Sequence, residues 1–243
     1  MIRFSELFCR SITRRPPAPH GSDGWAGAAA ASALPGWLIL LVTAAFLFIP
    51  RWSSGNALPE TGQVRFVADG DTIILESGEK VRYLGIDAPE IAHDKAGRDC
   101  YGEESRKLNR DLVLHQRVSL QYDQEKTDRH GRLLAYVILP DGKCANAVML
   151  RAGCALVYRP PQDFRRLQEF LLLQKEAIRQ HRGMWGACPV TPAQSYLGNR
   201  GTFVLHRLEC SLGKKIAAAR RVTFGNRWAG LEQGYRPCRL CKP

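Results

Sequence analysis

Charged residues interrupt two apolar runs in the stretch Val67 to Glu90, which reads VADGDTIILESGEKVRYLGIDAPE. The side chains of a strand alternate between its two faces, so Arg82 falls on the same face as Leu84 and Ile86. A charge buried on an apolar face destabilises the fold unless an opposite charge or a hydrogen-bonding group lies beside it. The turn ESGE predicts a hairpin, so the fold has to supply a partner for Arg82 at the end of that hairpin.

The pattern around this hairpin predicts a mixed α+β domain that is mainly β. Five short strands with a few helices suit a small, partly open barrel of the oligonucleotide-binding type (OB-fold). The expected strands cover 63–68, 71–75, 80–86, 117–122 and 133–139. Helices are expected at 102–115, 146–152 and 162–182, and the sequence GMWGACPVTP is expected to close the domain as a loop.

The predicted hairpin makes Asp71 and Asp87 neighbours in space. Two carboxylates that close repel each other unless a proton or a cation lies between them. A hard divalent cation with oxygen ligands, Ca²⁺ or Mg²⁺, fits this set. Pro89 fixes the following turn, which would aim the carbonyl of Ala88 at the same ion and bring Glu90 near its water. Taken singly, ADGD and DAPE are also explained as ordinary turns.

Turn formation does not explain the arginines. Arg82 lies on an apolar face, and the polar loop TDRHGR ends in Arg132 just before a strand. The planar guanidinium group matches phosphate oxygens. Two arginines, one cation and the free carboxylate of Glu90 form a complete set for attacking a phosphodiester.

The chain from Gln63 to about Pro189 resembles the staphylococcal nuclease (thermonuclease) family. The matching segments are DGDT at 69–72, Arg82, DAPE at 87–90, YGEES at 101–105, DRHGRLLAYV at 128–137 and MLRAGCALVY at 149–158. The resemblance implies an OB-fold nuclease, a hydrolase acting on ester bonds of DNA and/or RNA.

The same resemblance implies roles for individual residues. Asp71, Asp87 and the Ala88 carbonyl would bind Ca²⁺, and Glu90 would be the general base or orient the attacking water. Arg82 and Arg132 would hold the scissile phosphate and stabilise its five-coordinate state. Tyr158 would touch a neighbouring phosphate, and Arg129 is a further candidate for substrate binding. His130 and Leu156 stand where the family has tyrosines, which implies altered nucleotide contacts.

The segment from Trp25 to Pro50 carries no charged residue and is long enough to span a bilayer as a helix. Arginines precede it at positions 3, 10, 14 and 15, so the positive-inside rule places residues 1–25 in the cytoplasm and exports the rest. The segment is expected to be a single-pass anchor in the inner membrane, with the nuclease on the periplasmic side. A signal peptide cleaved near SGNA, giving a secreted protein, and a buried soluble helix are the alternatives.

Eight cysteines are present, four of them within the nuclease-like region. An even number suits disulfides in an oxidising compartment. We expect Cys100 to pair with Cys188, since both lie in loops that flank the domain, and Cys144 to pair with Cys154.

The chain from Arg200 onward is strongly basic, with ten Lys and Arg against two Glu. Such a charge indicates a polyanionic partner or an acidic membrane surface, and it is also compatible with a merely soluble surface. His206, Cys210, Cys238 and Cys241 form two short knuckles with the ligands of a closed tetrahedral Zn²⁺ site. The alternative is a Cys238–Cys241 bond beside an ordinary histidine.

This C-terminal region resembles the metal-binding domain of Ada-type alkylation-repair proteins through its GN and GYRPCRLC segments. In that family the first of four cysteine ligands accepts a methyl group, and His206 takes its place here, which argues against methyl transfer. The resemblance implies structural zinc in a basic module that holds nucleic acid through its phosphates.

The sequence therefore predicts five regions: a cytoplasmic tail (1–25), a transmembrane helix (26–50), a linker (51–62), a nuclease domain (63–190) and a zinc-binding domain (191–243). The expected activity is Ca²⁺-dependent hydrolysis of DNA and/or RNA outside the cytoplasm, with no protein partner inferred. The rival interpretation is a non-catalytic, membrane-anchored receptor that grips nucleic acid, for example during DNA uptake.

Overall fold

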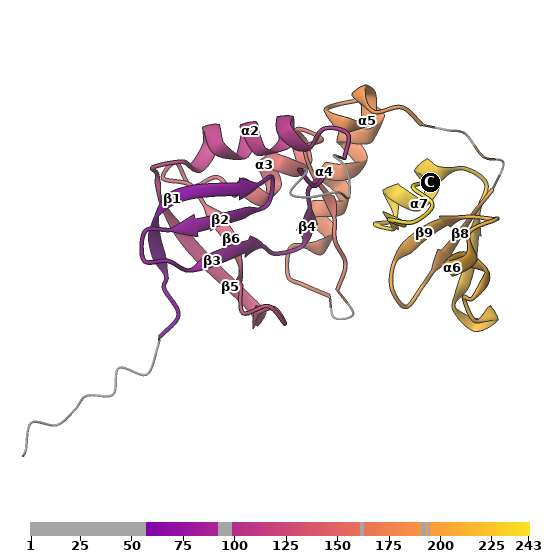
Figure 1. Ribbon diagram of the computed structural model, residues 1–243, viewed down its shortest axis with the longest axis horizontal. Coiled ribbons are helices and arrows are strands. Elements are labelled where there is room, and N and C mark those ends of the chain that lie inside the picture. The colour runs from indigo at the N-terminus through magenta and orange to yellow at the C-terminus, as the bar shows by residue number, and fades with distance from the viewer. Residues whose placement is uncertain (1–56, 92–98, 161–162, 191–192, 194) are drawn as a thin grey trace, which may run out of the picture. The chain divides into compact units, whose positions relative to one another are not determined.

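The computed structural model describes residues 57–243 except 92–98, 161–162, 191–192 and 194 (Figure 1). The predicted cytoplasmic tail, the predicted membrane helix and residues 51–56 of the linker lie outside the described residues. Within the described part of the chain, no helix has both the length and the apolar character needed to cross a bilayer.

Five strands close into a barrel in the order β1-β2-β3-β6-β5, which confirms the five-stranded barrel and shows it closed where the sequence predicted a partly open one. Their bounds are β1 Thr61–Asp69, β2 Thr72–Leu75, β3 Lys80–Tyr83, β5 Arg117–Thr127 and β6 Leu133–Ile138. β3 and β6 run parallel, whereas the other pairs are antiparallel. Alternate apolar side chains such as Ile73, Val81 and Tyr83 fill the interior and are almost fully buried.

The strand predicted over 80–86 is wrong beyond Tyr83. Gly85 adopts φ +79, and a Cβ atom there would lie 2.6 Å from the Phe164 ring, so the chain turns at a position that requires glycine. After the turn, the short strand β4 Ile86–Asp87 pairs with β7 Leu156–Val157 in a separate two-stranded sheet. This break moves Asp87 out of the barrel wall.

In the described part of the chain, four helices accompany the barrel: α2 Gly102–Val113, α3 Ala145–Arg151, α4 Leu167–Arg179 and α5 Met184–Ala187. The first three confirm predicted helices, although α4 is shorter at both ends than expected. The predicted loop GMWGACPVTP contains a helical turn instead, because Gly183, with φ +56, lets the chain turn into α5 against the backbone of Gly153.

The C-terminal module, which we define as residues 196–243, has a four-stranded sheet in the order β10-β8-β9-β11. Its elements are β8 Tyr196–Asn199, β9 Val204–Arg207, α6 Ser211–Lys214, the 3₁₀ turn η1 Ala218–Arg220, β10 Arg221–Phe224, α7 Arg227–Glu232 and β11 Arg236–Pro237. Its apolar residues, among them Leu205 and Leu231, form one cluster with Ile178 and Trp185 of the preceding helical segment. The side chain of Gln174 in α4 also donates to the Leu231 carbonyl at 2.5 Å.

Candidate active site

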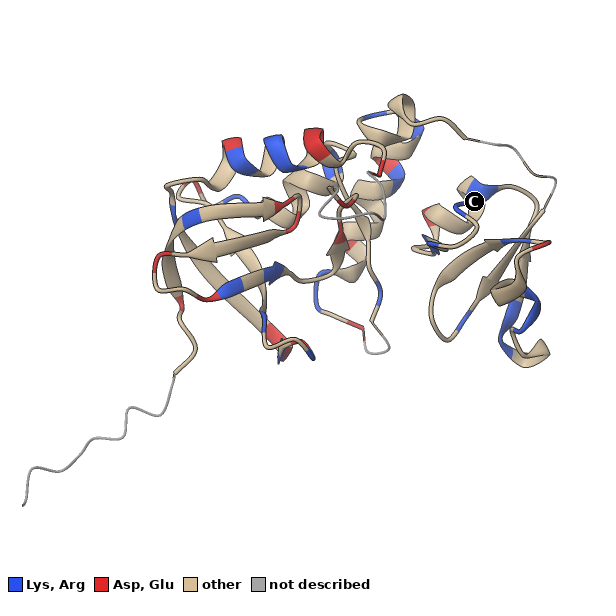
Figure 2. Ribbon diagram, viewed as in Figure 1, with Lys and Arg blue, Asp and Glu red and all other residues tan. Residues whose placement is uncertain are grey.

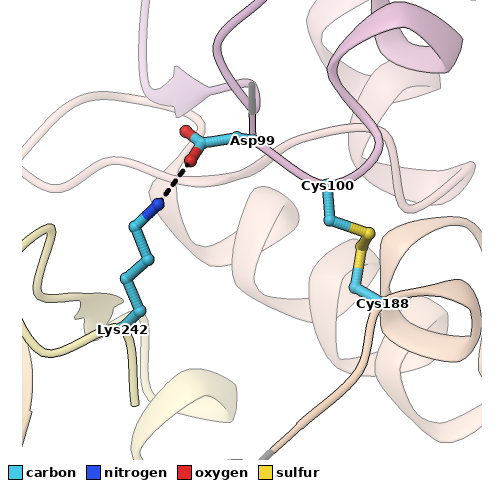
Figure 3. The surroundings of a disulfide bond; sticks show 4 residues. All are labelled: Asp99, Cys100, Cys188 and Lys242. Atoms are coloured by element: carbon cyan, nitrogen blue, oxygen red, sulfur yellow. Dashed lines mark hydrogen bonds and ion pairs between the residues drawn. A yellow bond between two sulfur atoms is a disulfide. The ribbon is translucent and has the colours of Figure 1, made fainter. Parts of the chain in front are cut away.

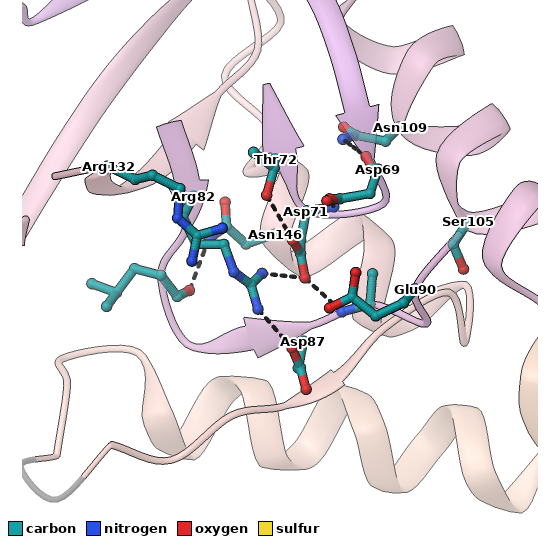
Figure 4. Close-up of polar contacts among 12 residues, drawn as sticks. Asp69, Asp71, Thr72, Arg82, Asp87, Glu90, Ser105, Asn109, Arg132 and Asn146 are labelled. Atoms are coloured by element: carbon teal, nitrogen blue, oxygen red, sulfur yellow. Dashed lines mark hydrogen bonds and ion pairs between the residues drawn. The ribbon is translucent and has the colours of Figure 1, made fainter. Parts of the chain in front are cut away.

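Arg82 meets two carboxylates at the open end of the β2–β3 hairpin (Figure 4). Its Nη2 atom lies 2.6 Å from Asp87 Oδ1, and its Nη1 atom forms an ion pair with Asp71 Oδ2. Antiparallel pairing of Thr72 with Arg82 brings Asp71 beside the arginine, and β4 supplies Asp87. The partner that the sequence required for Arg82 is therefore this acidic pair, and Asp71 and Asp87 are neighbours as predicted.

Asp71 is a buried acid held by several donors. Only 4% of the residue is exposed, and its Oδ2 atom accepts a hydrogen bond from the Ala88 amide at 2.6 Å. Burial raises the pKa of Asp71 to about 7 against the opposing effect of Arg82, and burial likewise raises the pKa of Asp87. Two acids in this state bind a proton or a cation readily.

Helix α2 holds the turn that carries Asp71 through the side chain of Asn109. The Asp71 amide donates to Asp69 Oδ1 at 3.0 Å, and Asn109 Nδ2 donates to the Asp69 carbonyl at 3.0 Å. Tyr83 Oη in turn donates to Asn109 Oδ1 at 2.8 Å. Gly70 permits this packing, since a Cβ atom there would lie 2.6 Å from the Ala88 Cβ atom. Asn109 was not identified from the sequence, because one amide on a helix has no local signal of burial.

Glu90 lies beside the acidic pair, on the side that the Arg239 side chain approaches. One Arg239 nitrogen, Nη2, is 3.3 Å from Glu90 Oε1 and 3.9 Å from Asp87 Oδ2, so both carboxylates face the same point. About half of the Glu90 side chain is exposed, which leaves it open to solvent water. Arg239 is a residue that the sequence placed in the basic C-terminal region but not beside this site.

The other predicted substrate-contacting residues are less closely grouped. Arg132 precedes β6, and its Nε atom donates to Asp128 Oδ2 at 2.7 Å. Because Arg82 pairs with Leu134 in the parallel β3–β6 pair, alternation puts Arg132 on the same face as Arg82. Arg129 is exposed in the same loop, with Nε 3.1 Å from His130 Nε2. Tyr158 follows β7, and the Arg236 guanidinium lies 5.2 Å from its ring centre.

The four predicted zinc ligands converge in the C-terminal module. One ligand atom from each of His206, Cys210, Cys238 and Cys241 lies within 4.8 Å of the others. Parallel pairing of Pro237 with Leu205 brings Cys238 to the end of β9, where His206 lies. Burial lowers the pKa of His206, which favours the neutral ring that binds metals. The cluster is a candidate metal centre, and its cysteines form no disulfide.

Of the two predicted disulfides, one is confirmed and the other is wrong. Cys100 and Cys188 form the expected disulfide, with Cα atoms 5.8 Å apart (Figure 3). The predicted Cys144–Cys154 pair is wrong, because both thiols are free and buried. Helix α3, with 7 residues from Ala145 to Arg151, lies between the two cysteines, and a helix of that length spans about 10 Å, more than the Cα separation that a disulfide bridges.

Comparison with known proteins agrees with the nuclease-like geometry. The family model described as "Staphylococcal nuclease homologue" matches residues 80–187. A thermonuclease of Staphylococcus intermedius is 36% identical over 138 residues, which cover 55% of this chain and 80% of that protein. An uncharacterized endonuclease of Escherichia coli O157:H7 is 39% identical over 135 residues, covering 54% of this chain and 81% of its own length.

A third relative, endonuclease YncB of Bacillus subtilis, is 35% identical over 140 residues, which cover 55% of this chain and 62% of the relative. These aligned segments are shorter than the chain and account for little more than half of it. Together with the closed barrel and the paired acids around Arg82, the comparisons show that the chain belongs to the staphylococcal nuclease family.

Proposed function

We propose that the protein is a nuclease that hydrolyses phosphodiester bonds of DNA and/or RNA with the help of Ca²⁺. The observation that carries the proposal is the contact of one guanidinium group, Arg82, with both Asp71 and Asp87 at the open end of the β2–β3 hairpin. The relatives named thermonuclease and endonuclease support the reaction class.

The acidic pair fits a hard divalent cation. Both acids contact the same guanidinium group, so their oxygens lie close together, and carboxylate oxygens are the ligands that a hard cation prefers. Asp71 and Asp87 would hold the ion, with the Ala88 carbonyl as a further proposed ligand. When bound, the ion supplies a Lewis acid that draws charge from a phosphate oxygen.

The chain's own groups account for the remaining steps. Glu90, exposed and facing the same point as Asp87, takes a proton from the attacking water. Arg82 and Arg132 hold the phosphate oxygens and stabilise the charge that builds up on them during attack. Tyr158 and Arg129 would contact the strand on either side of the bond that breaks.

The Cys/His cluster is proposed to hold Zn²⁺ in a structural role. Three thiolates and one imidazole are a usual tetrahedral set, and a module with so small a core gains folding free energy from the metal. The resemblance to the Ada-type metal-binding domain supports the same metal. We propose residues 191–243 as this zinc domain and residues 63–190 as the nuclease domain.

The nuclease is proposed to operate outside the cytoplasm, on the periplasmic side of the inner membrane, held by residues 26–50 or released after signal cleavage. The Cys100–Cys188 disulfide supports this location, because such bonds persist in oxidising compartments. Fractionation of cells that express the tagged chain tests it: recovery in the cytoplasm would contradict the proposal.

The activity is tested with purified protein on labelled DNA and RNA. Cleavage is expected with Ca²⁺, is expected to stop when a chelator is added, and is expected to return when Ca²⁺ alone is restored. Glu90→Gln should lower turnover about 100-fold or more, whereas the exposed barrel variant Glu76→Gln serves as the matched control with unchanged turnover. Binding without any cation-dependent cleavage would favour the receptor interpretation instead.

A further inference from the structure

A cleft of about 420 Å³ lies beside the proposed catalytic acids, between residues of the barrel domain and the C-terminal module. Its acidic side includes Asp87, Glu90 and Asp99. Its basic side comes from the module; the cationic residues there are Arg207, Arg227, Arg236, Arg239 and Lys242. The module is rich in Lys and Arg, drawn blue in Figure 2.

The cations of the cleft fall into two groups. Arg239 pairs with Glu90 at 3.3 Å, and Lys242 pairs with Asp99 at 3.0 Å. Among the described residues, no carboxylate lies within ion-pair distance of Arg207, Arg227 or Arg236. The second group therefore has no direct ion-pair partner in the described part of the chain.

The second group also carries hydrogen-bond donors that are left without acceptors. In the part of the chain that the structure describes, the buried Nε atoms of Arg207, Arg227 and Arg236 have no hydrogen-bond partner, and neither does the indole nitrogen of Trp185. A buried donor without a partner destabilises a fold by about 1–3 kcal/mol. Four such donors around one cleft indicate a ligand that brings oxygen acceptors and negative charge.

Aromatic rings lie among these donors. The centroids of Trp185 and Trp228 are 6.4 Å apart at 71°, and the Arg227 guanidinium lies 4.8 Å from the Trp228 ring centre. Trp185 is buried, whereas Trp228 is partly exposed at the cleft. An aromatic face beside phosphate-binding cations is what a nucleotide with an unpaired base requires.

We propose that this cleft binds a single-stranded segment of nucleic acid, with phosphates on Arg207, Arg227 and Arg236 and a base against Trp228. The proposal deepens the proposed function, since it makes the C-terminal module a direct extension of the substrate site at Asp87 and Glu90. A paired base has no free face for Trp228, so the cleft selects unpaired strands over duplexes.

The test measures binding of a fluorescent 12-nucleotide single strand by anisotropy. The full chain is used in detergent and carries Asp71→Asn, which blocks the proposed cation site without altering a cleft residue. Adding Arg227→Gln and Arg236→Gln should raise Kd about 100-fold, roughly tenfold for each lost charged hydrogen bond. The slope of log Kd against log salt should fall by about 1.4, or 0.7 for each phosphate contact.

The matched control is Lys215→Gln with Arg220→Gln, which removes the same charge from exposed positions of the same module that do not line the cleft. Its Kd should change less than about threefold. Equal weakening by the two pairs would mean that only the overall positive charge matters, and would overturn the proposal. Unfolding temperature and metal content are compared with the parent to verify the fold.

A second measurement needs no arginine variant. A single strand with 5-iodouracil is cross-linked to the Asp71→Asn parent by light, and the attached peptide is identified by mass spectrometry. We expect attachment at Trp228, with a threefold or greater preference for the single strand over the same sequence in a duplex. Attachment confined to the barrel would overturn the proposal.

The two proposals fail in different ways. If the unmodified chain cleaves nucleic acid but the cleft variants bind as tightly as the control, the cleft is wrong and the nuclease remains. If the cleft variants lose binding but no cation supports cleavage, the cleft remains and the nuclease is wrong.

Discussion

The acidic site of the barrel and the Cys/His cluster of the C-terminal module differ in how their polar groups are satisfied. In the barrel, Arg82 is paired with Asp71 and Asp87, and the Ala88 amide supports Asp71. In the module, four ligand atoms crowd within 4.8 Å, and nearby arginines bury donors without acceptors among the described residues. The barrel site is thus organised by the chain itself, whereas the module depends on what it binds.

The largest expected difference follows from removing one metal ligand. Cys238→Ser should abolish binding of one equivalent of zinc and unfold the module, because its small core lacks the stability to fold alone. Limited proteolysis should then cut within 196–243 and leave the barrel intact. Cys154→Ala, a cysteine outside the cluster, is the control and should retain the metal; a protease-resistant Cys238→Ser module would contradict this.

A substitution in the barrel should affect the reaction rather than the fold. Arg82→Lys keeps one positive charge but cannot reach both carboxylates and the phosphate with a planar fork, so kcat should fall about 100- to 1,000-fold. The exposed Arg65→Lys is the matched control and should leave kcat unchanged. Steady-state cleavage rates and circular dichroism measure the two effects, and a near-normal kcat for Arg82→Lys would remove its assigned role.

Removing a buried, fully hydrogen-bonded polar side chain from the barrel should also lower the free energy of unfolding. Asn146 is fully buried; its side chain accepts from the Val137 amide at 3.0 Å and donates to the Leu84 carbonyl at 2.9 Å. Asn146→Ala leaves both backbone groups without this partner, so the free energy of unfolding should fall by about 2–4 kcal/mol. Urea unfolding measures it, and a loss below about 0.5 kcal/mol, the size expected of a surface change, would show that water replaces the amide.

The smallest expected effect is a pH dependence of the barrel site. Because the pKa of Asp71 is raised to about 7, a cation must displace a proton below that pH, and Ca²⁺ affinity should fall up to tenfold per pH unit. Calorimetric titration with Ca²⁺ at several pH values measures this. An affinity that stays constant from pH 5 to 8 would show that Asp71 is already ionised.

The stability of the calcium-free protein should also depend on the protonation of Asp71. It should fall as the pH rises, whereas the Ca²⁺ affinity should increase. The folded pKa of Asp71 lies above its ordinary value of 3.8, so the folded state binds the proton more tightly than the unfolded state does. Its contribution to stability is present below about pH 4 and is lost as the pH rises through about 7. Asp71→Asn should remove this part of the pH dependence.

Much of the barrel site could be predicted from the sequence because its information is local. A two-residue period and a tight turn together predict that Asp71 and Arg82 meet. The expected face shared by Arg82, Leu84 and Ile86 is wrong, because β3 ends at Tyr83 and Arg82 lies on the face opposite the buried Val81 and Tyr83. The spacing of His206, Cys210, Cys238 and Cys241 likewise predicted their convergence. In both places the residues that make the site lie at strand ends or in short knuckles.

The rest depends on packing between distant parts of the chain. The turn at Gly85 follows from the approach of Phe164, and the position of Arg239 beside Glu90 follows from contacts between the module and the helical segment. The buried amides of Asn109 and Asn146 have no repeating pattern that would mark them. The wrong Cys144–Cys154 pairing came from counting cysteines without allowing for the length of the intervening helix.

The Cys100–Cys188 bond contributes to the wall of the cleft. Reduction would leave the two sulfur atoms free and unlink the loop before α2 from the end of α5, while the contacts around Arg82 involve neither cysteine. Cys100 directly follows Asp99, which accepts a hydrogen bond from the Glu90 amide, so the bond also borders the proposed general base. Redox conditions would then act on strand capture and on the placement of Glu90, and leave the contacts between Arg82 and the acidic pair in place.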